Sequence, residues 1–306
     1  MIYDMIIIGS GAAGMNAALY AGRSGLNTLV LESVGSGGQM NNTYEVANYL
    51  GFPENPSGAE LAQKMRVHAG IYGAEFRTER VKNIENVNEK IKTVNTRKNS
   101  YQTRCVLFAT GANPRKLNAP GEAEFSGIGV SYCATCDGAF FRGQTTAVVG
   151  GGNTAFEDAL CLARFCSEVY LIHRSDRFRA SAVLVEEVKN NPKIHILPFC
   201  TVSQILGDTT VKQLSLQDSR TGETKLLDCS GVFIAIGRIA ANEIVPPEIL
   251  LDESGFIRTD ERMQTNIPGI YAAGDIRTTP LRQVITAAAD GAVAAISALN
   301  YLDTLK

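Results

Sequence analysis

The chain has 306 residues, of which 45% are hydrophobic and 20% are charged, proportions typical of a globular protein with a sizeable core. A chain of this length is expected to form about two domains. Its 29 basic and 31 acidic residues give a net charge of −2, so the charge balance carries no signal for binding nucleic acid or an anionic membrane.

The start of the chain, Met1-Ile2-Tyr3-Asp4, is unlike a secretory signal, which has basic residues before a long apolar run. No apolar run approaches the roughly 18 residues that span a bilayer. We therefore expect a cytoplasmic protein, where disulfides are usually catalytic. Five cysteines in apolar segments are expected to be small buried hydrophobes: Cys105, Cys161, Cys166, Cys200 and Cys229.

The first segment has the pattern of a dinucleotide-binding unit. A buried strand is expected at Tyr3–Ile8, a helix at Met15–Ser24 and a second strand at Asn27–Leu31. Glu32 follows the second strand, 23 residues after Gly9, where an acid accepts from a ribose hydroxyl. Between the first strand and the helix lies a GxGxxG turn, which fits a pyrophosphate better than a plain turn: Gly9, Ser10, Gly11, Ala12, Ala13 and Gly14.

The next glycine-rich stretch, Gly35–Met40, is either a surface loop or a backbone that passes close to a flat cofactor, with Gln39 as a hydrogen bonder. A helix is expected at Glu60–Tyr72. Alternating short strands over Phe76–Tyr101 predict a hairpin layer laid on the main sheet. A buried strand at Cys105–Ala109 ends the segment, and Ala112–Gly121 is expected to cross to another domain.

The stretch Ser131–Phe141 contains the pair Cys133 and Cys136, followed at once by Asp137. Two cysteines at this spacing can close and reopen a small disulfide, which suits electron transfer better than structural stapling. The adjacent acid could supply or collect the proton that thiol–disulfide exchange moves.

A second dinucleotide unit follows, with strands expected at Thr145–Val149 and Glu168–Ile172 and a helix at Phe156–Phe165. No acid stands at the position that matches Glu32; the residue there is His173. Arginines that follow at this position are better explained by binding of the 2′-phosphate of NADP than by a solvated basic loop. The candidate residues for this nucleotide are Gly150, Gly152, Asn153, Thr154, Ala155, His173, Arg174, Arg177 and Arg179.

The remaining pattern returns to the first unit. A helix at Ala180–Lys189, strands over Ile194–Leu227 and Gly231–Ile236, and a second crossing at Gly237–Pro247 are expected. A strand at Gly269–Ala273 leads to Gly274 and Asp275, and a helix over Arg282–Leu299 directs a positive dipole end at the cofactor.

These elements predict an α/β protein with two Rossmann-like, three-layer dinucleotide-binding domains, one inserted into the other. Expected boundaries are 1–114 and 241–306 for a discontinuous FAD-binding domain, and 115–240 for an NADPH-binding domain that carries the dithiol. Such a layout is typical of flavoenzymes that take electrons from a nicotinamide donor.

The combination resembles the low-molecular-weight, bacterial-type thioredoxin reductases over essentially the whole chain. The residues that carry this resemblance are Gly9–Gly14, Gly37, Gly38, Gln39, Asn48, Ala109, Thr110, Gly111, Cys133–Gly138, Gly150–Thr154, His173–Arg179, Ala273, Gly274, Asp275, Arg282, Gln283 and Val284.

The resemblance implies that NADPH passes hydride to FAD and that reduced FAD reduces the Cys133–Cys136 disulfide, with Cys136 nearer the flavin. It implies that Asp137 donates and accepts protons and that Cys133 attacks the disulfide of thioredoxin or a similar small protein. A homodimer without a metal is expected, with rotation of the inserted domain about the two crossings.

Three departures from the family pattern leave alternatives open. Ser175 replaces the second arginine of a His-Arg-Arg motif, which bears on the preference for NADPH over NADH. Leu50 and Ala240-Ala241 replace usual prolines. A related flavin-dependent reductase or dithiol oxidase, using NADH or ferredoxin or another acceptor, is the second hypothesis. A non-enzymatic flavoprotein or a zinc module is the third, although zinc needs four ligands and one CxxC supplies two.

Overall fold

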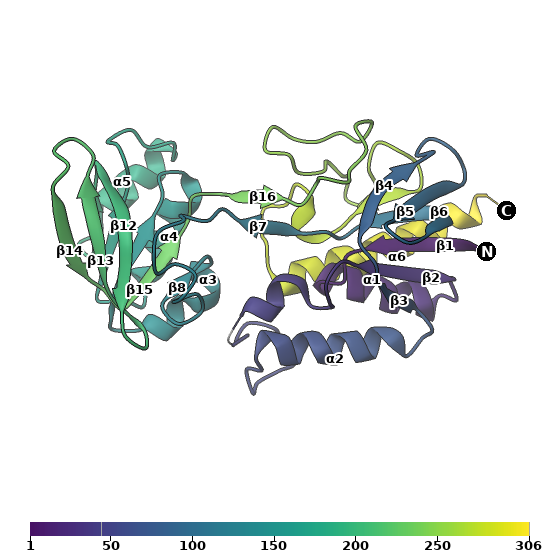
Figure 1. The fold of residues 1–306 in the computed structure, drawn as a ribbon, viewed down its shortest axis with the longest axis horizontal. Coiled ribbons are helices and arrows are strands. Elements are labelled where there is room, and N and C mark those ends of the chain that lie inside the picture. Colours follow the sequence, from purple (N-terminus) through teal and green to yellow (C-terminus); the bar gives the residue numbers. More distant parts are fainter. Residues whose placement is uncertain (44, 306) are drawn as a thin grey trace. The chain divides into compact units, whose positions relative to one another are not determined.

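The computed structural model describes residues 1–43 and 45–305 and contains two compact units. One unit joins Met1–Asn113 to Ile239–Lys306, and the other is Pro114–Arg238. In Figure 1 the first is purple, blue and yellow, and the inserted unit is teal and green. The connecting segments β7 (Ala112–Pro114) and β16 (Arg238–Ala240) pair as a two-stranded sheet.

The first unit is built on a parallel sheet. Its strands are β1 (Ile2–Ile8), β2 (Thr28–Glu32), β3 (Glu75–Thr78), β6 (Ser100–Phe108) and β17 (Ile270–Ala272). They run in the order β3-β2-β1-β6, and β17 pairs with β6. The exposed fraction is at most 4% for Ile6–Ile8 of β1 and for Leu29 and Val30 of β2, as expected for strands covered on both faces.

The hairpin expected within Phe76–Tyr101 is present, and its Val81, Ile84 and Val94 share a core with Ile6 and Leu29 of the main sheet, but it is also joined to that sheet. The strands β4 (Val81–Glu85) and β5 (Lys92–Thr96) belong to the same sheet as β1. The nine-residue strand β6 explains this, because its start pairs antiparallel with β5 while its end pairs in parallel with β17. Strand β6 therefore pairs with two different strands, β5 and β17, along one of its edges.

Three helices accompany the sheet of the first unit: α1 (Ala12–Arg23), α2 (Gly58–Gly70) and α6 (Val284–Asp303). Helices α1 and α6 approach closely at Gly291, where a Cβ atom would lie 2.1 Å from the Ala13 carbonyl oxygen. Only glycine permits this backbone contact. By length and composition α6 could cross a membrane, but its buried alanines pack in the core that includes α1.

The inserted unit has a five-stranded parallel sheet in the order β11-β10-β9-β15-β8. Its strands are β8 (Val130–Ser131), β9 (Thr145–Val149), β10 (Glu168–Ile172), β11 (Ile194–Leu197) and β15 (Gly231–Ile234). An antiparallel sheet is formed by β12 (Cys200–Gly207), β13 (Val211–Asp218) and β14 (Thr224–Asp228). The helices are α3 (Ala134–Asp137), α4 (Asn153–Leu162) and α5 (Ala182–Asn190).

Both glycine-turn helices begin earlier than expected. Helix α1 starts at Ala12 rather than Met15, and α4 starts at Asn153 rather than Phe156. The last residues of each glycine motif thus form the first helical turn, whose backbone N–H groups have no partner within the helix. Short 3₁₀ segments occur at η1 (Gly38–Asn42), η2 (Gly138–Phe141) and η3 (Gly274–Ile276).

Candidate active site

The first glycine turn is shaped by close backbone contacts. At Gly9, which has φ of +103°, a Cβ atom would lie 2.4 Å from the Ala109 carbonyl oxygen, and at Gly14 it would lie 1.9 Å from the Gly9 carbonyl oxygen. A side chain at Gly11, the N-cap of α1, would meet nothing within 4 Å. The turn therefore presents the open N-terminus of α1, where a pyrophosphate can accept backbone N–H groups.

Glu32, at the end of β2, is fixed beside this turn. Its carboxylate accepts the Ser10 backbone N–H at 2.8 Å, the Ser10 hydroxyl at 3.0 Å and the Ser33 backbone N–H at 2.6 Å. The Ser10 and Ser33 hydroxyls also donate to this carboxylate, and both can rotate away, so Glu32 can accept from a ribose hydroxyl in place of one of them. These residues fit the adenosine half of a dinucleotide.

Other predicted flavin residues gather at the carboxyl ends of β1, β6 and β17. A Cβ atom at Gly38 would lie 3.4 Å from Gly11 Cα, and one at Gly274 would lie 3.0 Å from Ala13 Cβ. The Ala273 backbone N–H donates to the Phe108 carbonyl. Nearby, Gln39 donates to the Asn113 side chain, and the Thr110 hydroxyl, just before Gly111, donates to the Ala241 carbonyl. The carboxyl end of a parallel sheet is where such folds bind ligands.

The N-terminus of α6 brings another group of predicted residues together. Gln283 is the N-cap, in a reciprocal capping box with Thr286, and its side chain accepts from Asn48 Nδ2 at 3.0 Å. Arg282 donates to the Asp275 carbonyl at 3.5 Å, and its guanidinium group covers the Phe256 ring. Val284 is the first helical residue. The positive end of the helix dipole lies at this point.

Asp290, within α6, is a residue that the sequence reasoning missed. Its carboxylate accepts the Gly274 backbone N–H at 3.1 Å and the Arg277 guanidinium at 3.2 Å. Both side chains of this ion pair are largely buried, so Asp290 holds the turn that carries Asp275. A signal was present, because Asp290 is a lone acid within a long run of apolar and small residues.

In the inserted unit, Cys133 and Cys136 form a disulfide with a Cα–Cα distance of 5.3 Å. Cys133 is the N-cap of the one-turn helix α3, and its carbonyl accepts the backbone N–H groups of Cys136 and Asp137. Gly138 allows this helix to approach α4, since a Cβ there would lie 3.0 Å from Leu162 Cδ2. The dithiol is thus carried on a short helix that packs against α4, the helix of the second nucleotide turn.

Asp137 is held behind the disulfide by Ser131. The Ser131 hydroxyl donates to Asp137 Oδ2 at 2.5 Å, and its oxygen accepts the Cys133 backbone N–H at 3.1 Å. Burial raises the pKa of Asp137 above its ordinary value of 3.8, and the Ser131 hydrogen bond opposes that rise. A carboxyl group that retains its proton to higher pH is a better proton donor near neutrality.

The second glycine turn repeats the geometry of the first. A Cβ atom at Gly150 would lie 2.4 Å from the Ala235 carbonyl oxygen and 2.7 Å from Ala155 Cβ, whereas one at Gly152 would meet nothing within 4 Å. The Asn153 side chain accepts the Ser181 backbone N–H at 2.9 Å, while Thr154 is exposed on the first turn of α4. The open N-terminus of α4 fits a second pyrophosphate.

The basic cluster follows β10. The His173 ring lies against Gly151, and burial lowers its pKa. The Arg179 backbone N–H donates to the Gly151 carbonyl at 2.7 Å, and Ser175 forms a turn with the backbone of Arg177. The side chains of Arg174, Arg177 and Arg179 are exposed. This places three cations on the loop that follows the glycine turn, where they can reach an anionic group.

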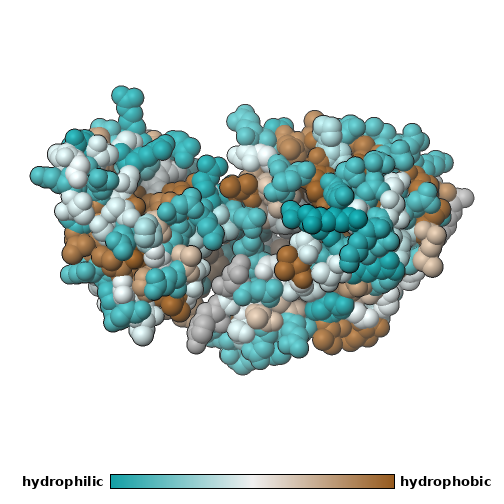
Figure 2. Space-filling model, in the orientation of Figure 1, coloured by the Kyte–Doolittle hydropathy of each residue, from teal (hydrophilic) through white to brown (hydrophobic). Residues whose placement is uncertain are grey.

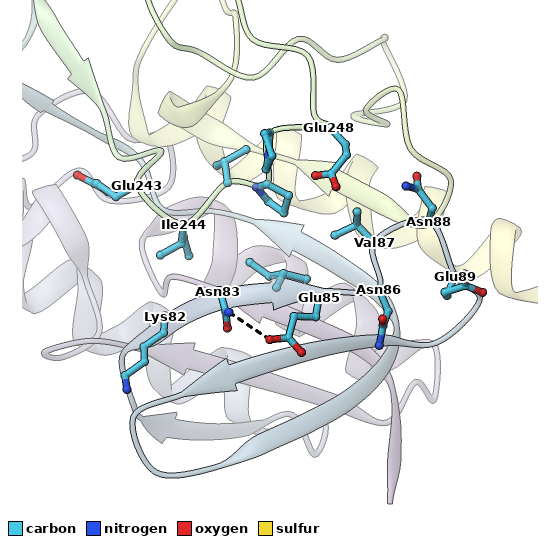
Figure 3. A pocket seen from close by; sticks show the side chains of 14 residues that line it. Lys82, Asn83, Glu85, Asn86, Val87, Asn88, Glu89, Glu243, Ile244 and Glu248 are labelled. Atoms are coloured by element: carbon cyan, nitrogen blue, oxygen red, sulfur yellow. Dashed lines mark hydrogen bonds between the residues drawn. The ribbon is translucent and has the colours of Figure 1, made fainter.

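A cavity of about 630 Å³ in the first unit lies elsewhere (Figure 3). It is lined by the segment Lys82–Glu89 and by Glu243–Glu248, and Asn83 donates to Glu85 beside it at 3.2 Å. Its acidic lining contains none of the predicted site residues.

The comparisons with known proteins agree with this geometry. The pyridine nucleotide-disulphide oxidoreductase family matches residues 3–291. Thioredoxin reductase of Treponema pallidum is 43% identical over 99% of this chain and 98% of its own length, and that of Bacillus subtilis is 44% identical over 100% and 96%. The crystal structure of thioredoxin reductase from Streptococcus pyogenes matches with a TM-score of 0.94 at 42% identity, covering 99% of both chains.

Two nucleotide turns, each with an open helix N-terminus, and a CxxC disulfide define a pyridine nucleotide-disulphide oxidoreductase, and the chain belongs to that family. Within the family it groups with the low-molecular-weight thioredoxin reductases, whose curated members match it from end to end.

Proposed function

We propose that this protein is an NADPH-dependent thioredoxin-disulfide reductase that uses FAD. The observation that carries the proposal is the Cys133–Cys136 disulfide with the partly buried Asp137 carboxyl group beside it, on a unit that also has a nucleotide turn. The names of the similar proteins support thioredoxin as the substrate.

The residues of the first unit would hold FAD. The turn Gly9–Gly14 would bind the pyrophosphate and Glu32 the ribose, while the N-terminus of α6 and Asp275 would lie at the flavin end. When bound, a flavin accepts hydride from a reduced nicotinamide and delivers the electron pair to a disulfide.

The chain's own thiols perform the exchange with the protein substrate. The thiolate of reduced Cys133 attacks one sulfur of the substrate disulfide, which forms a mixed disulfide and releases a substrate thiolate. Cys136 then attacks Cys133 Sγ, which releases the second substrate thiol and restores the Cys133–Cys136 disulfide. Asp137 exchanges the protons that accompany these steps, because it is held next to Cys136 in α3 and hydrogen-bonded to Ser131.

The test of this proposal is a coupled assay with oxidised thioredoxin. We expect one NADPH to be consumed for each pair of thioredoxin thiols formed, since a disulfide takes up two electrons. Consumption of NADPH without thiol formation would contradict the proposal and favour a flavin oxidase.

Arg174→Ala is expected to raise the KM for NADPH by about 10-fold or more while leaving the KM for NADH unchanged. The reason is the loss of a charge-assisted contact with the 2′-phosphate, which NADH lacks. Steady-state kinetics with both nucleotides measure the effect. Lys225→Ala removes an exposed cation from β14 of the same unit and is the matched control. Equal losses for both nucleotides would rule out the phosphate-binding role.

We also propose a cytoplasmic homodimer that forms through the first unit. Figure 2 shows an apolar patch over the C-terminal end of α2, where Val67 and Ile71 are 63% and 66% exposed. On α6, Ile285, Val293 and Ile296 are also exposed. Apolar side chains gathered in this way commonly mark protein interfaces, and light scattering would give twice the mass of the chain.

A further inference from the structure

Glu122 is a buried acid in the inserted unit, with only 3% of its surface exposed. Its carboxylate accepts three hydrogen bonds. Oε1 accepts the Leu117 backbone N–H at 3.0 Å and the Tyr132 hydroxyl at 2.7 Å, and Oε2 accepts the Asn118 backbone N–H at 2.5 Å. A buried carboxylate is costly unless its oxygens are satisfied in this way, so these donors fix its position.

The backbone around Glu122 is itself anchored to the antiparallel sheet. Gly121, with φ of +90°, passes so close to β12 that a Cβ atom would lie 2.2 Å from the Ile205 carbonyl oxygen. The Pro120 carbonyl accepts the Ile205 backbone N–H at 2.9 Å. Glu122 is therefore presented from a rigid turn, not from a loose loop.

The Tyr132 hydroxyl that Glu122 holds belongs to the residue immediately before Cys133. Burial and Glu122 together raise the pKa of Tyr132, so the phenol keeps its proton and donates a hydrogen bond to the carboxylate. The preceding residue, Ser131, has different partners, Asp137 and the Cys133 backbone N–H. The chain just before Cys133 is therefore held by two separate sets of hydrogen bonds, one through Tyr132 and one through Ser131.

We propose that Glu122 is a positioning residue for the thiol of Cys133 and acts through the Tyr132 hydroxyl. The inference rests on the proposed function, in which Cys133 attacks the protein substrate. It assigns Glu122 no contact with substrate or cofactor. A fixed backbone at Cys133 keeps its sulfur within reach of Cys136 and in one orientation toward an incoming disulfide, and such orientation accounts for much of the rate of a bond-forming step.

The experiment compares Tyr132→Phe and Glu122→Gln with Tyr170→Phe as the matched control. Tyr170 is on β10 of the same unit, where its ring stacks on His195. The first readout is the equilibrium between the Cys133–Cys136 disulfide and its dithiol. It is set in glutathione buffers with the flavin-loaded protein and measured by alkylation of the free thiols. The second is kcat/KM for oxidised thioredoxin, set against the rate at which NADPH bleaches the flavin.

We expect Tyr132→Phe to shift the equilibrium about 3-fold toward the dithiol, because a less constrained pair of thiols closes less readily. We expect kcat/KM for thioredoxin to fall about 10-fold, with flavin bleaching unchanged. Glu122→Gln should produce at least the same changes. The double variant should shift the disulfide equilibrium and lower kcat/KM no more than the more affected single variant does, since both residues act through one hydrogen bond.

Two results would overturn the inference. One is a disulfide equilibrium in Tyr132→Phe that equals that of Tyr170→Phe. The other is a loss of flavin bleaching in parallel with thioredoxin reduction, which would indicate general structural damage. Tyr132→Phe retains both backbone donors to Glu122, so it remains informative if Glu122→Gln does not fold. The glutathione equilibrium needs no protein substrate, so it tests the inference even if wild-type protein fails to reduce thioredoxin.

Discussion

Cys136→Ser is expected to lower the turnover of protein disulfide reduction by about 1,000-fold or more, because a serine hydroxyl cannot close the disulfide that carries the electrons. NADPH should still bleach the flavin absorbance at the wild-type rate, since the nucleotide turns contain no part of the dithiol. Stopped-flow absorbance and the thioredoxin assay measure the two quantities on the same protein.

Cys161→Ser is the matched control for this variant. Cys161 is a partly exposed free cysteine on α4 in the same unit, and its replacement should leave both rates unchanged. If Cys136→Ser retained turnover, the Cys133–Cys136 disulfide would have no part in the reaction and the proposed function would be wrong.

Asp137→Asn is expected to reduce turnover by about 100-fold while making the protein more stable at neutral pH. The rate falls because asparagine cannot transfer the proton that thiol exchange requires. The Ser131 hydroxyl can still donate to the amide oxygen, so the geometry before Cys133 is retained. Asp228→Asn, which changes an exposed acid on β14, is the control for both effects.

The gain in stability depends on pH in a defined direction. Burial raises the pKa of Asp137 in the folded protein above its ordinary value of 3.8. The folded state then binds more protons than the unfolded state, so wild-type stability falls as pH rises from about 3.8 through the folded-state pKa, and is level above it. Melting temperatures should differ little between wild type and variant at the acid end and most at neutral pH. A constant difference across this range would refute the burial argument.

Much of the fold follows from local patterns in the sequence. The strands β1, β9 and β10 and the two glycine turns are short segments whose apolar character and spacing specify them directly. The compact units end at Asn113 and Arg238, close to the boundaries at 114 and 240 that the two glycine motifs and the crossings suggest. The chain returns to its first unit at Ile239, and β17, just before Gly274 and Asp275, joins the sheet of that unit.

The supporting contacts of the candidate site could not be predicted in this way. Asp290 is 16 residues from Gly274, and Glu122 is 10 residues from Tyr132, so neither pair follows from helix or strand spacing. Ser131 stands beside the dithiol in sequence, but its bond to Asp137 depends on the turn of α3. Likewise, the sequence indicates short strands after α2 without revealing that β5 joins the edge of β6.

The central claim is that electrons pass from a nicotinamide nucleotide through the flavin to the Cys133–Cys136 pair and on to a protein disulfide. An anaerobic titration of the flavin-loaded protein with NADPH, and separately with NADH, tests it most directly through the flavin absorbance. We expect rapid bleaching with NADPH and recovery of the absorbance when oxidised thioredoxin is added. Bleaching with NADH alone would show that the basic cluster around Arg174 does not select the phosphate, and no bleaching with either nucleotide would contradict the account.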